Sequence, residues 1–171
     1  NPSIGLAASG SGNIASFNAV NATNAPITAT ITVTPETSPT TGAVCTGAPI
    51  VFTITVNPVP NVSTVANQTV CTGAAVPSIV FASNTPGATF SWSRTNEAIG
   101  LAVNSGTGNI PAFTAANAGT TPLTSTFSVV ASFNNNGVTC TGTPIQFTVT
   151  VNPAPTVSAS QTSQTVCNGS T

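Results

Sequence analysis

The sequence lacks most of the side chains on which enzyme chemistry depends. It contains no His, Lys, Asp, Tyr or Met, and its three charged residues are Glu36, Arg94 and Glu97. Without His and Asp, neither a Ser-His-Asp site nor a Cys-His site can be built. A paired-carboxylate glycosidase would have to use Glu36 with Glu97, because the chain has no other acid. The composition therefore predicts that the protein is not an enzyme and needs no cofactor.

The same shortage argues against several kinds of binding site. A calcium site of the acidic-loop kind has no Asp to use. Zinc would have to be held by cysteines alone, and none of the four cysteines forms a CxxC pair, so we expect no metal. One arginine cannot neutralise a run of phosphates, so we expect no nucleic-acid partner. No apolar run approaches the roughly 20 residues that a membrane-spanning helix requires.

Ser, Thr and Asn take the place of the missing side chains. Ser and Thr together number 50 of the 171 residues, and Asn adds 18. Hydrophobic residues make up 40%, which is enough to fill a core, so the chain is not predicted to be disordered. A polar surface with almost no charge repels neighbouring copies weakly and favours self-association. We expect an extracellular or cell-surface location, which also permits disulfides.

The chain repeats itself with a period of 95 to 96 residues. Matches at a single period along the whole chain identify an internal repeat. The matching segments are IGLAASGSGNIASF at 4–17 with IGLAVNSGTGNIPAF at 99–113, CTGAPI at 45–50 with CTGTPI at 140–145, VFTITVNPVP at 51–60 with QFTVTVNPAP at 146–155, and QTVC at 68–71 with QTVC at 164–167.

Two proline-containing segments divide the chain into repeats. The motif VNP-x-P occurs at 56–60 and again at 151–155, and proline stiffens a connection by fixing φ. We expect a complete repeat at 58–153, preceded by the C-terminal part of one repeat at 1–57. Residues 154–171 are expected to begin the next repeat.

Alternation of apolar residues with Thr predicts β-strands. Residues 50–56 place Ile, Phe, Ile and Val on one face, and residues 145–151 repeat that pattern. No segment keeps a helical period. The expected fold is all-β, with tandem immunoglobulin-like β-sandwich repeats of about 95 residues. Strands are expected near 61–66, 76–82, 88–94, 98–103, 108–113, 123–133 and 144–151. The expected core aromatic residues are Trp92, Phe90, Phe113, Phe127 and Phe147.

The four cysteines permit more than one arrangement. A disulfide between Cys71 and Cys140 would close a loop of about 70 residues and stabilise the repeat by about 4 kcal/mol through chain entropy. Two buried free thiols are one alternative, and a bond between Cys45 and Cys71 across the joint is another. Cys45 and Cys167 lie in incomplete repeats, and a bond between them would link two subunits.

A few residues are candidates for recognition or modification. Trp92 could stack on a sugar, although a lone Trp in an alternating strand is more typical of a core. Arg94 and Glu97 are expected to form a surface pair of little energetic worth, and Glu36 a solvated loop charge. N-x-S/T sequons make Asn21, Asn61, Asn67 and Asn168 candidate acceptors of glycans, and the Thr-rich faces could carry O-linked sugars.

The repeated motifs also carry a family resemblance. VCTG, an FSW strand, IG-SG-GNIP-F and CTG-PI-FT-TVNP-P together resemble PKD-like immunoglobulin-type repeats of very large surface proteins in Bacteroidetes-type bacteria. Gliding adhesins and other proteins exported by the type IX route carry such arrays. The acidic motif that often follows the Trp strand in the broader class is absent here, because Ser93-Arg94 follows Trp92.

The resemblance implies a structural role in an extracellular filament or a cell-surface adhesin stalk. Its partners would be adjacent repeats or subunits of the same fibre, together with surface glycans. The filament could be one continuous chain of repeats, or short subunits that lend an edge strand to one another. The alternative function is a carbohydrate-binding or spacer module of a larger secreted protein.

Overall fold

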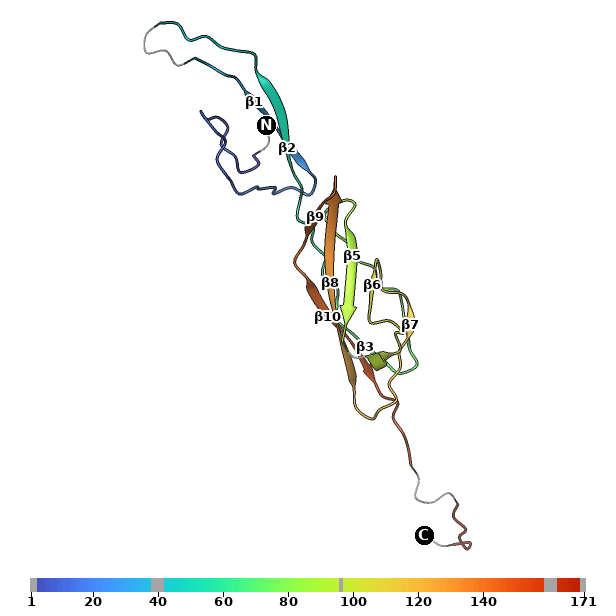
Figure 1. Ribbon diagram of the computed structural model, residues 1–171. Helices are drawn as coiled ribbons and strands as arrows, with labels where there is room; N and C mark the ends of the chain where they lie inside the picture. Colours follow the sequence, from blue (N-terminus) through green and yellow to red (C-terminus); the bar gives the residue numbers. More distant parts are fainter. Residues whose placement is uncertain (1–2, 38–41, 96, 159–162, 170–171) are drawn as a thin grey trace.

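The computed structural model describes residues 3–37, 42–95, 97–158 and 163–169, and it confirms the all-β prediction. Its elements follow the chain along one elongated molecule (Figure 1). The strands are β1 Ile27–Val33, β2 Ile50–Val56, β3 Gln68–Cys71, β4 Ala75–Val76, β5 Thr89–Arg94, β6 Ser105–Thr107, β7 Phe113–Thr114, β8 Leu123–Asn135, β9 Val138–Thr141 and β10 Ile145–Asn152, and the 3-10 helix η1 is Glu97–Ile99.

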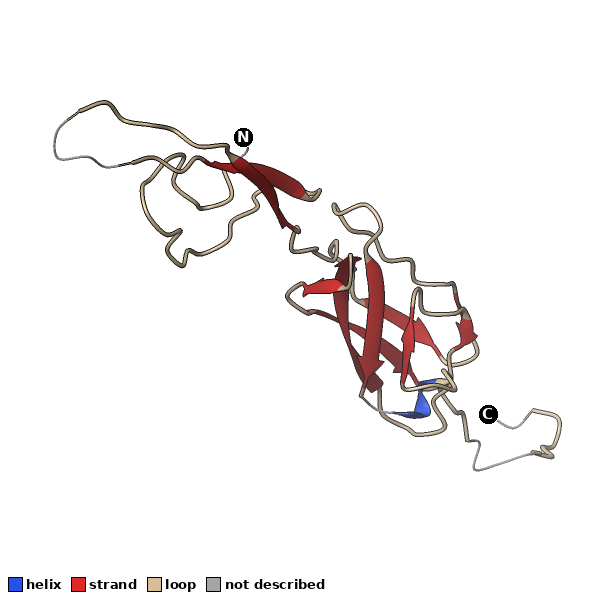
Figure 2. Ribbon diagram, turned by 45° about the horizontal axis from the view of Figure 1, so that its top comes forward, coloured by secondary structure: helices blue, strands red, loops and turns tan. Residues whose placement is uncertain are grey.

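The larger sheet of the molecule has six strands, β3, β5, β6, β8, β9 and β10. Its strand order is β3-β10-β8-β5-β6, and β9 pairs with the far end of β8. Strands β3 and β10 run parallel, whereas the other pairs are antiparallel. The opposing layer is the short β4–β7 pair, extended by a bridge between Ile79 and Ile110 (Figure 2). The apolar core lies between these two layers.

Aromatic rings fill the middle of that core. The rings of Phe127 and Phe147 stack with centroids 5.0 Å apart, and Trp92 lies 6.2 Å from Phe127. These three residues are buried as predicted, whereas Phe90 and Phe113 are only half-buried at the core's edge. Phe81 is a buried core member that the sequence did not reveal, because it lies outside any strand with a clear alternation.

The strand prediction is wrong for residues 98–103. Helix η1 and a loop occupy this segment. Gly100 has a φ of 96°, a conformation that a strand does not contain. A Cβ at this glycine would lie 2.0 Å from the carbonyl oxygen of Thr114, so only glycine allows this close crossing.

Other strands are shorter than predicted or shifted. Residues 61–66 form no ladder, and the first strand of the larger sheet is β3. The predicted strands at 76–82 and 108–113 reduce to β4, β7 and one bridge. Strand β9 was missed, although Asn136-Gly137 between β8 and β9 is a strong hairpin signal.

The first repeat segment copies the geometry of the complete one. Strands β1 and β2 pair Ile27 with Val56, as β8 and β10 pair Leu123 with Val151. The amide of Val20 donates to the carbonyl of Ile4, and at the equivalent position Ala116 donates to Ile99. The period seen in the sequence is therefore also a period of the backbone.

The structure does not bring Cys71 and Cys140 close enough for the expected disulfide. Both cysteines are free thiols in the described part of the chain. Cys71 pairs with Asn152 at one end of β10, whereas Cys140 pairs with Phe133 near the other end of β8. That register separates them by roughly 33 Å along the strands, whereas a disulfide requires Cα atoms within about 7 Å.

Candidate functional site

The candidate site is the joint between the first hairpin and the larger sheet, which we define as residues 57–61. Pro58 and Pro60 are fully buried, which is unusual for a linker between two units. The Asn57 Oδ1 atom accepts a hydrogen bond of 2.8 Å from Nδ2 of Asn135 at the end of β8. Two buried prolines and a hydrogen bond between residues 78 positions apart hold the connection in one conformation.

The backbone of Gly142 packs directly against the joint. A Cβ at position 142 would lie 2.0 Å from the carbonyl oxygen of Pro60. The amide of Gly142 donates to the carbonyl of Ala131, which ties this contact to β8. Glycine is therefore required here by close approach, because any side chain would push Pro60 away.

A second set of asparagine contacts spans the joint. The Asn61 Oδ1 atom accepts a hydrogen bond of 3.1 Å from the amide of Asn84. The Asn84 side chain then donates from Nδ2 to Oδ1 of Asn24 in the first repeat segment, at 2.7 Å. All of these groups are uncharged, so we expect the joint to be insensitive to salt.

The joint lies between two units that follow each other along the molecule. The β1–β2 hairpin lies on one side of it, and the larger sheet on the other (Figure 1). The chain leaves the larger sheet at the opposite end, through Asn152-Pro153-Ala154-Pro155. These residues correspond to Asn57-Pro58-Val59-Pro60 at the joint. The connections at the two ends of the larger sheet therefore share one sequence pattern.

Replacing Asn135 by Ala is expected to loosen the joint without unfolding the sheet. The change removes the half-buried hydrogen bond between the side chains of Asn135 and Asn57, which contributes about 1 kcal/mol. Residual dipolar couplings should fit one alignment tensor for hairpin and sheet in the native chain, and two different tensors in the variant. Asn134→Ala is the matched control, because Asn134 bonds to Thr139 inside the β8–β9 hairpin. Equal effects of both changes would contradict a role of Asn135 in the joint.

Trp92 does not form a sugar-stacking surface. The side chain is 4% exposed and lies against Phe127 in the core. Its Nε1 atom is buried and has no hydrogen-bond partner among the described residues. Gly106 on the neighbouring strand β6 lies so close that a Cβ there would be 2.7 Å from the indole ring.

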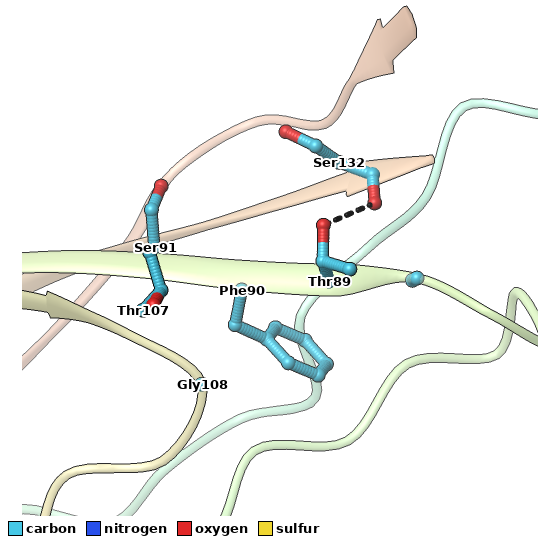
Figure 3. A pocket seen from close by; sticks show the side chains of 7 residues that line it. Thr89, Phe90, Ser91, Thr107, Gly108 and Ser132 are labelled. Atoms are coloured by element: carbon cyan, nitrogen blue, oxygen red, sulfur yellow. Dashed lines mark hydrogen bonds between the residues drawn. The ribbon is translucent and has the colours of Figure 1, made fainter. Parts of the chain in front are cut away.

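A shallow depression of about 560 Å³ lies over β5, β6 and β8. Figure 3 shows Thr89 donating through Oγ1 to the carbonyl of Ser132, with the Phe90 ring on the other side of β5. The lining consists of Ala88, Thr89, Phe90, Ser91, Thr107, Gly108 and Ser132. It offers hydroxyls and one aromatic ring but no ionisable group, so general acid–base catalysis has no donor here.

Arg94 is not the surface residue that the sequence suggested. It is buried, and its Nε and Nη2 atoms donate to the carbonyls of Val103 and Leu101. The guanidinium therefore fixes the loop that follows η1. Glu97 begins η1, and its side chain lies outside the described residues. Glu36 is exposed and forms an isolated bridge with Thr46 at the far end of the first hairpin.

The candidate glycan acceptors lie in different environments. The Asn21 amide donates hydrogen bonds of 2.8 Å to the carbonyls of both Ala25 and Val56, so attachment at Nδ2 would remove at least one of them. The Oδ1 atoms of Asn61 and Asn67 accept backbone hydrogen bonds, and Asn168 is exposed.

The described residues carry no cluster of three or more metal-binding side chains. Within the same ranges, no helix has the length and apolar character needed to cross a bilayer.

The sequence profile of the PKD-like domain matches residues 68–155, which is just over half of the chain. The chain belongs to the PKD-like domain family. The match begins with β3 and ends just beyond β10, so the PKD-like domain comprises the larger sheet and the opposing β4–β7 pair. No curated protein matches the chain.

Sequence reasoning located the joint of this PKD-like protein but missed the residues that hold it together. The VNP-x-P motif marked its position, but nothing local marked Asn84, Asn135 or Gly142. Asn84 contacts a residue 60 positions away, and Asn135 one 78 positions away. The repeated CTG-P motif, which contains Gly142, was the one available signal.

Proposed function

We propose that this chain is a structural segment of an extracellular filament or a cell-surface adhesin stalk built from tandem immunoglobulin-like repeats. PKD-like domains are immunoglobulin-like modules typical of extracellular or surface proteins. The nearly uncharged, Thr-rich surface supports this setting, because Arg94, the single basic residue that trypsin-like proteases could cleave after, is buried. The source that we propose is a bacterium of Bacteroidetes type, with export by the type IX route.

The observation that carries the proposal is the buried joint. A flexible tether exposes its backbone to solvent, whereas Pro58 and Pro60 are fully buried and Asn57 is bonded to Asn135. A protein that only needed two loosely connected modules would not require this packing. We propose that the repeat boundaries lie at 57/58 and 153/154. Each repeat would then dock on the next through the four residues equivalent to Asn57-Pro58-Val59-Pro60.

The role in a filament can be tested on intact cells. Immunogold labelling with antibodies to this chain should mark filaments that extend from the outer cell surface. Mass measurement under denaturing and reducing conditions then separates the two architectures. A mass far above the 16.7 kDa of this chain means continuous tandem repeats, and a mass near it means polymerised subunits. Labelling confined to the cell interior would refute the proposal.

The alternative, a carbohydrate-binding module, has weaker support. Such modules present aromatic platforms, whereas Trp92 is buried and Phe90 is the only ring that lines the depression on β5. Specific binding of this chain on a glycan array, lost in Phe90→Ala, would favour the alternative.

A further inference from the structure

The β1–β2 hairpin exposes the apolar face that the complete repeat buries. Phe52 on β2 is 39% exposed, whereas the equivalent Phe147 on β10 is 2% exposed. Ile50 on the same face is 65% exposed. Within the described ranges, β2 pairs with β1 alone, so its other edge is open. An open edge beside an apolar face is the feature to which added strands bind.

The complete repeat shows what covers this edge. Strand β10, the equivalent of β2, pairs in parallel with β3. The amide of Thr72 donates to the carbonyl of Asn152, and the amide of Gly73 donates to the carbonyl of Ala115. The equivalent acceptors beside β2 are the carbonyls of Asn57 and Ala19, which follow from the repeat period. The first segment therefore has the backbone acceptors that a strand equivalent to β3 would use.

The chain carries a second copy of the β3 strand. Residues 164–167 read Gln-Thr-Val-Cys, identical to β3, and they are exposed and belong to no strand. The turn that follows already has the required form, because Gly169 has a φ of 90° where Gly73 has 84°. A segment that is preshaped in this way loses less conformational entropy when it docks.

The geometry points to an association between two copies of this chain, in which residues 164–167 of one copy add to β2 of the other in parallel. The register copied from β10 and β3 is Ile54 with Gln164, Thr55 with Thr165, Val56 with Val166, and Asn57 with Cys167. This inference deepens the proposed function by naming a contact that joins filament segments end to end.

Residues 164–167 cannot pair with β2 of their own copy of residues 1–171. Residues 164–167 follow the end of the larger sheet that lies opposite the hairpin (Figure 1). Reaching the hairpin from Asn152 requires passing the whole 13-residue strand β8, roughly 40 Å, and then the further length of β2 up to Ile54. The chain from Asn152 to Gln164 spans about 40 Å only when it is fully extended. Residues 164–167 therefore reach β2 only in a second copy of the chain.

Sedimentation velocity of the chain of residues 1–171 tests the inference. Under reducing conditions we expect species larger than the monomer, whose share rises with concentration. Val166→Pro should weaken this association at least tenfold. The backbone amides of every second residue in a strand point to the same side, so the amide of Val70 points toward β10 as that of Thr72 does. Val166 is the equivalent of Val70, and proline at this position has no amide hydrogen to donate to β2.

Val157→Pro is the matched control for this experiment. Val157 lies in the same exposed C-terminal stretch, is 96% exposed and has no place in the proposed ladder, so this variant should associate like the native chain. A monomer at every concentration, or equal association of both proline variants, would overturn the inference. Either result would leave the surface location of the protein, tested by immunogold labelling, unaffected.

A cysteine pair tests the register directly. With the four native cysteines replaced by Ser, Thr55→Cys with Thr165→Cys should form disulfide-linked dimers and longer chains on mild oxidation. In the control pair, Thr53→Cys with Thr165→Cys, the β2 thiol lies on the same face but two residues out of register. This pair should crosslink at least tenfold more slowly. Equal crosslinking of the two pairs would exclude the proposed register.

Discussion

Replacing Trp92 by Ala is expected to lower the free energy of unfolding of the PKD-like domain by about 3–5 kcal/mol. The indole is 4% exposed, lies against Phe127, which stacks on Phe147, and is covered by Gly106. No charge network among the described residues offsets the stability that would be lost to a cavity at this position. Chemical denaturation, followed by circular dichroism, should show a lower midpoint with an unchanged slope.

Trp92→Phe separates the packing of this residue from its polarity. The indole Nε1 is buried without a hydrogen-bond partner among the described residues, and an unpaired donor of this kind costs about 1–3 kcal/mol. Phenylalanine removes that donor and keeps most of the apolar contact, so we expect a loss below about 1.5 kcal/mol. A loss as large as that of Trp92→Ala would mean that the indole nitrogen makes a stabilising contact.

Replacing Gly142 by Ala is expected to destabilise the joint and the sheet together, by about 3 kcal/mol or somewhat less. The added Cβ would lie 2.0 Å from the carbonyl oxygen of Pro60, so the backbone on one side must move. The position has no positive φ, so the effect comes from the close contact alone. Thermal unfolding should show a melting temperature lower by roughly 10 °C or more for a domain of this size.

Gly10→Ala is the matched control for this change. No heavy atom lies within 4 Å of a Cβ at position 10, and its φ is not positive. We expect its stability to stay within about 0.5 kcal/mol of the native chain. If Gly142→Ala proved equally neutral, the close packing of the joint would be refuted, and with it the main support for a stiff connection.

The most regular parts of this fold could be predicted from the sequence. Strands β5, β8 and β10 largely alternate apolar and polar side chains, and each lies where the alternation placed it. Strands β4 and β7 have two residues each and show no period. The segment at 98–103 alternates like a strand, but the crossing at Gly100 leaves no room for one.

The sequence by itself determined the all-β class, the period of the repeats and the scarcity of ionisable side chains, because these depend on composition and on patterns within the sequence. Only the tertiary structure decided that Cys71 and Cys140 lie at opposite ends of the sheet and that Arg94 is buried. It also decided that Asn57 is hydrogen-bonded to Asn135 and that, among the described residues, one edge of β2 has no neighbouring strand. Each of these depends on strand register, which brings together residues tens of positions apart, and no local pattern encodes that pairing.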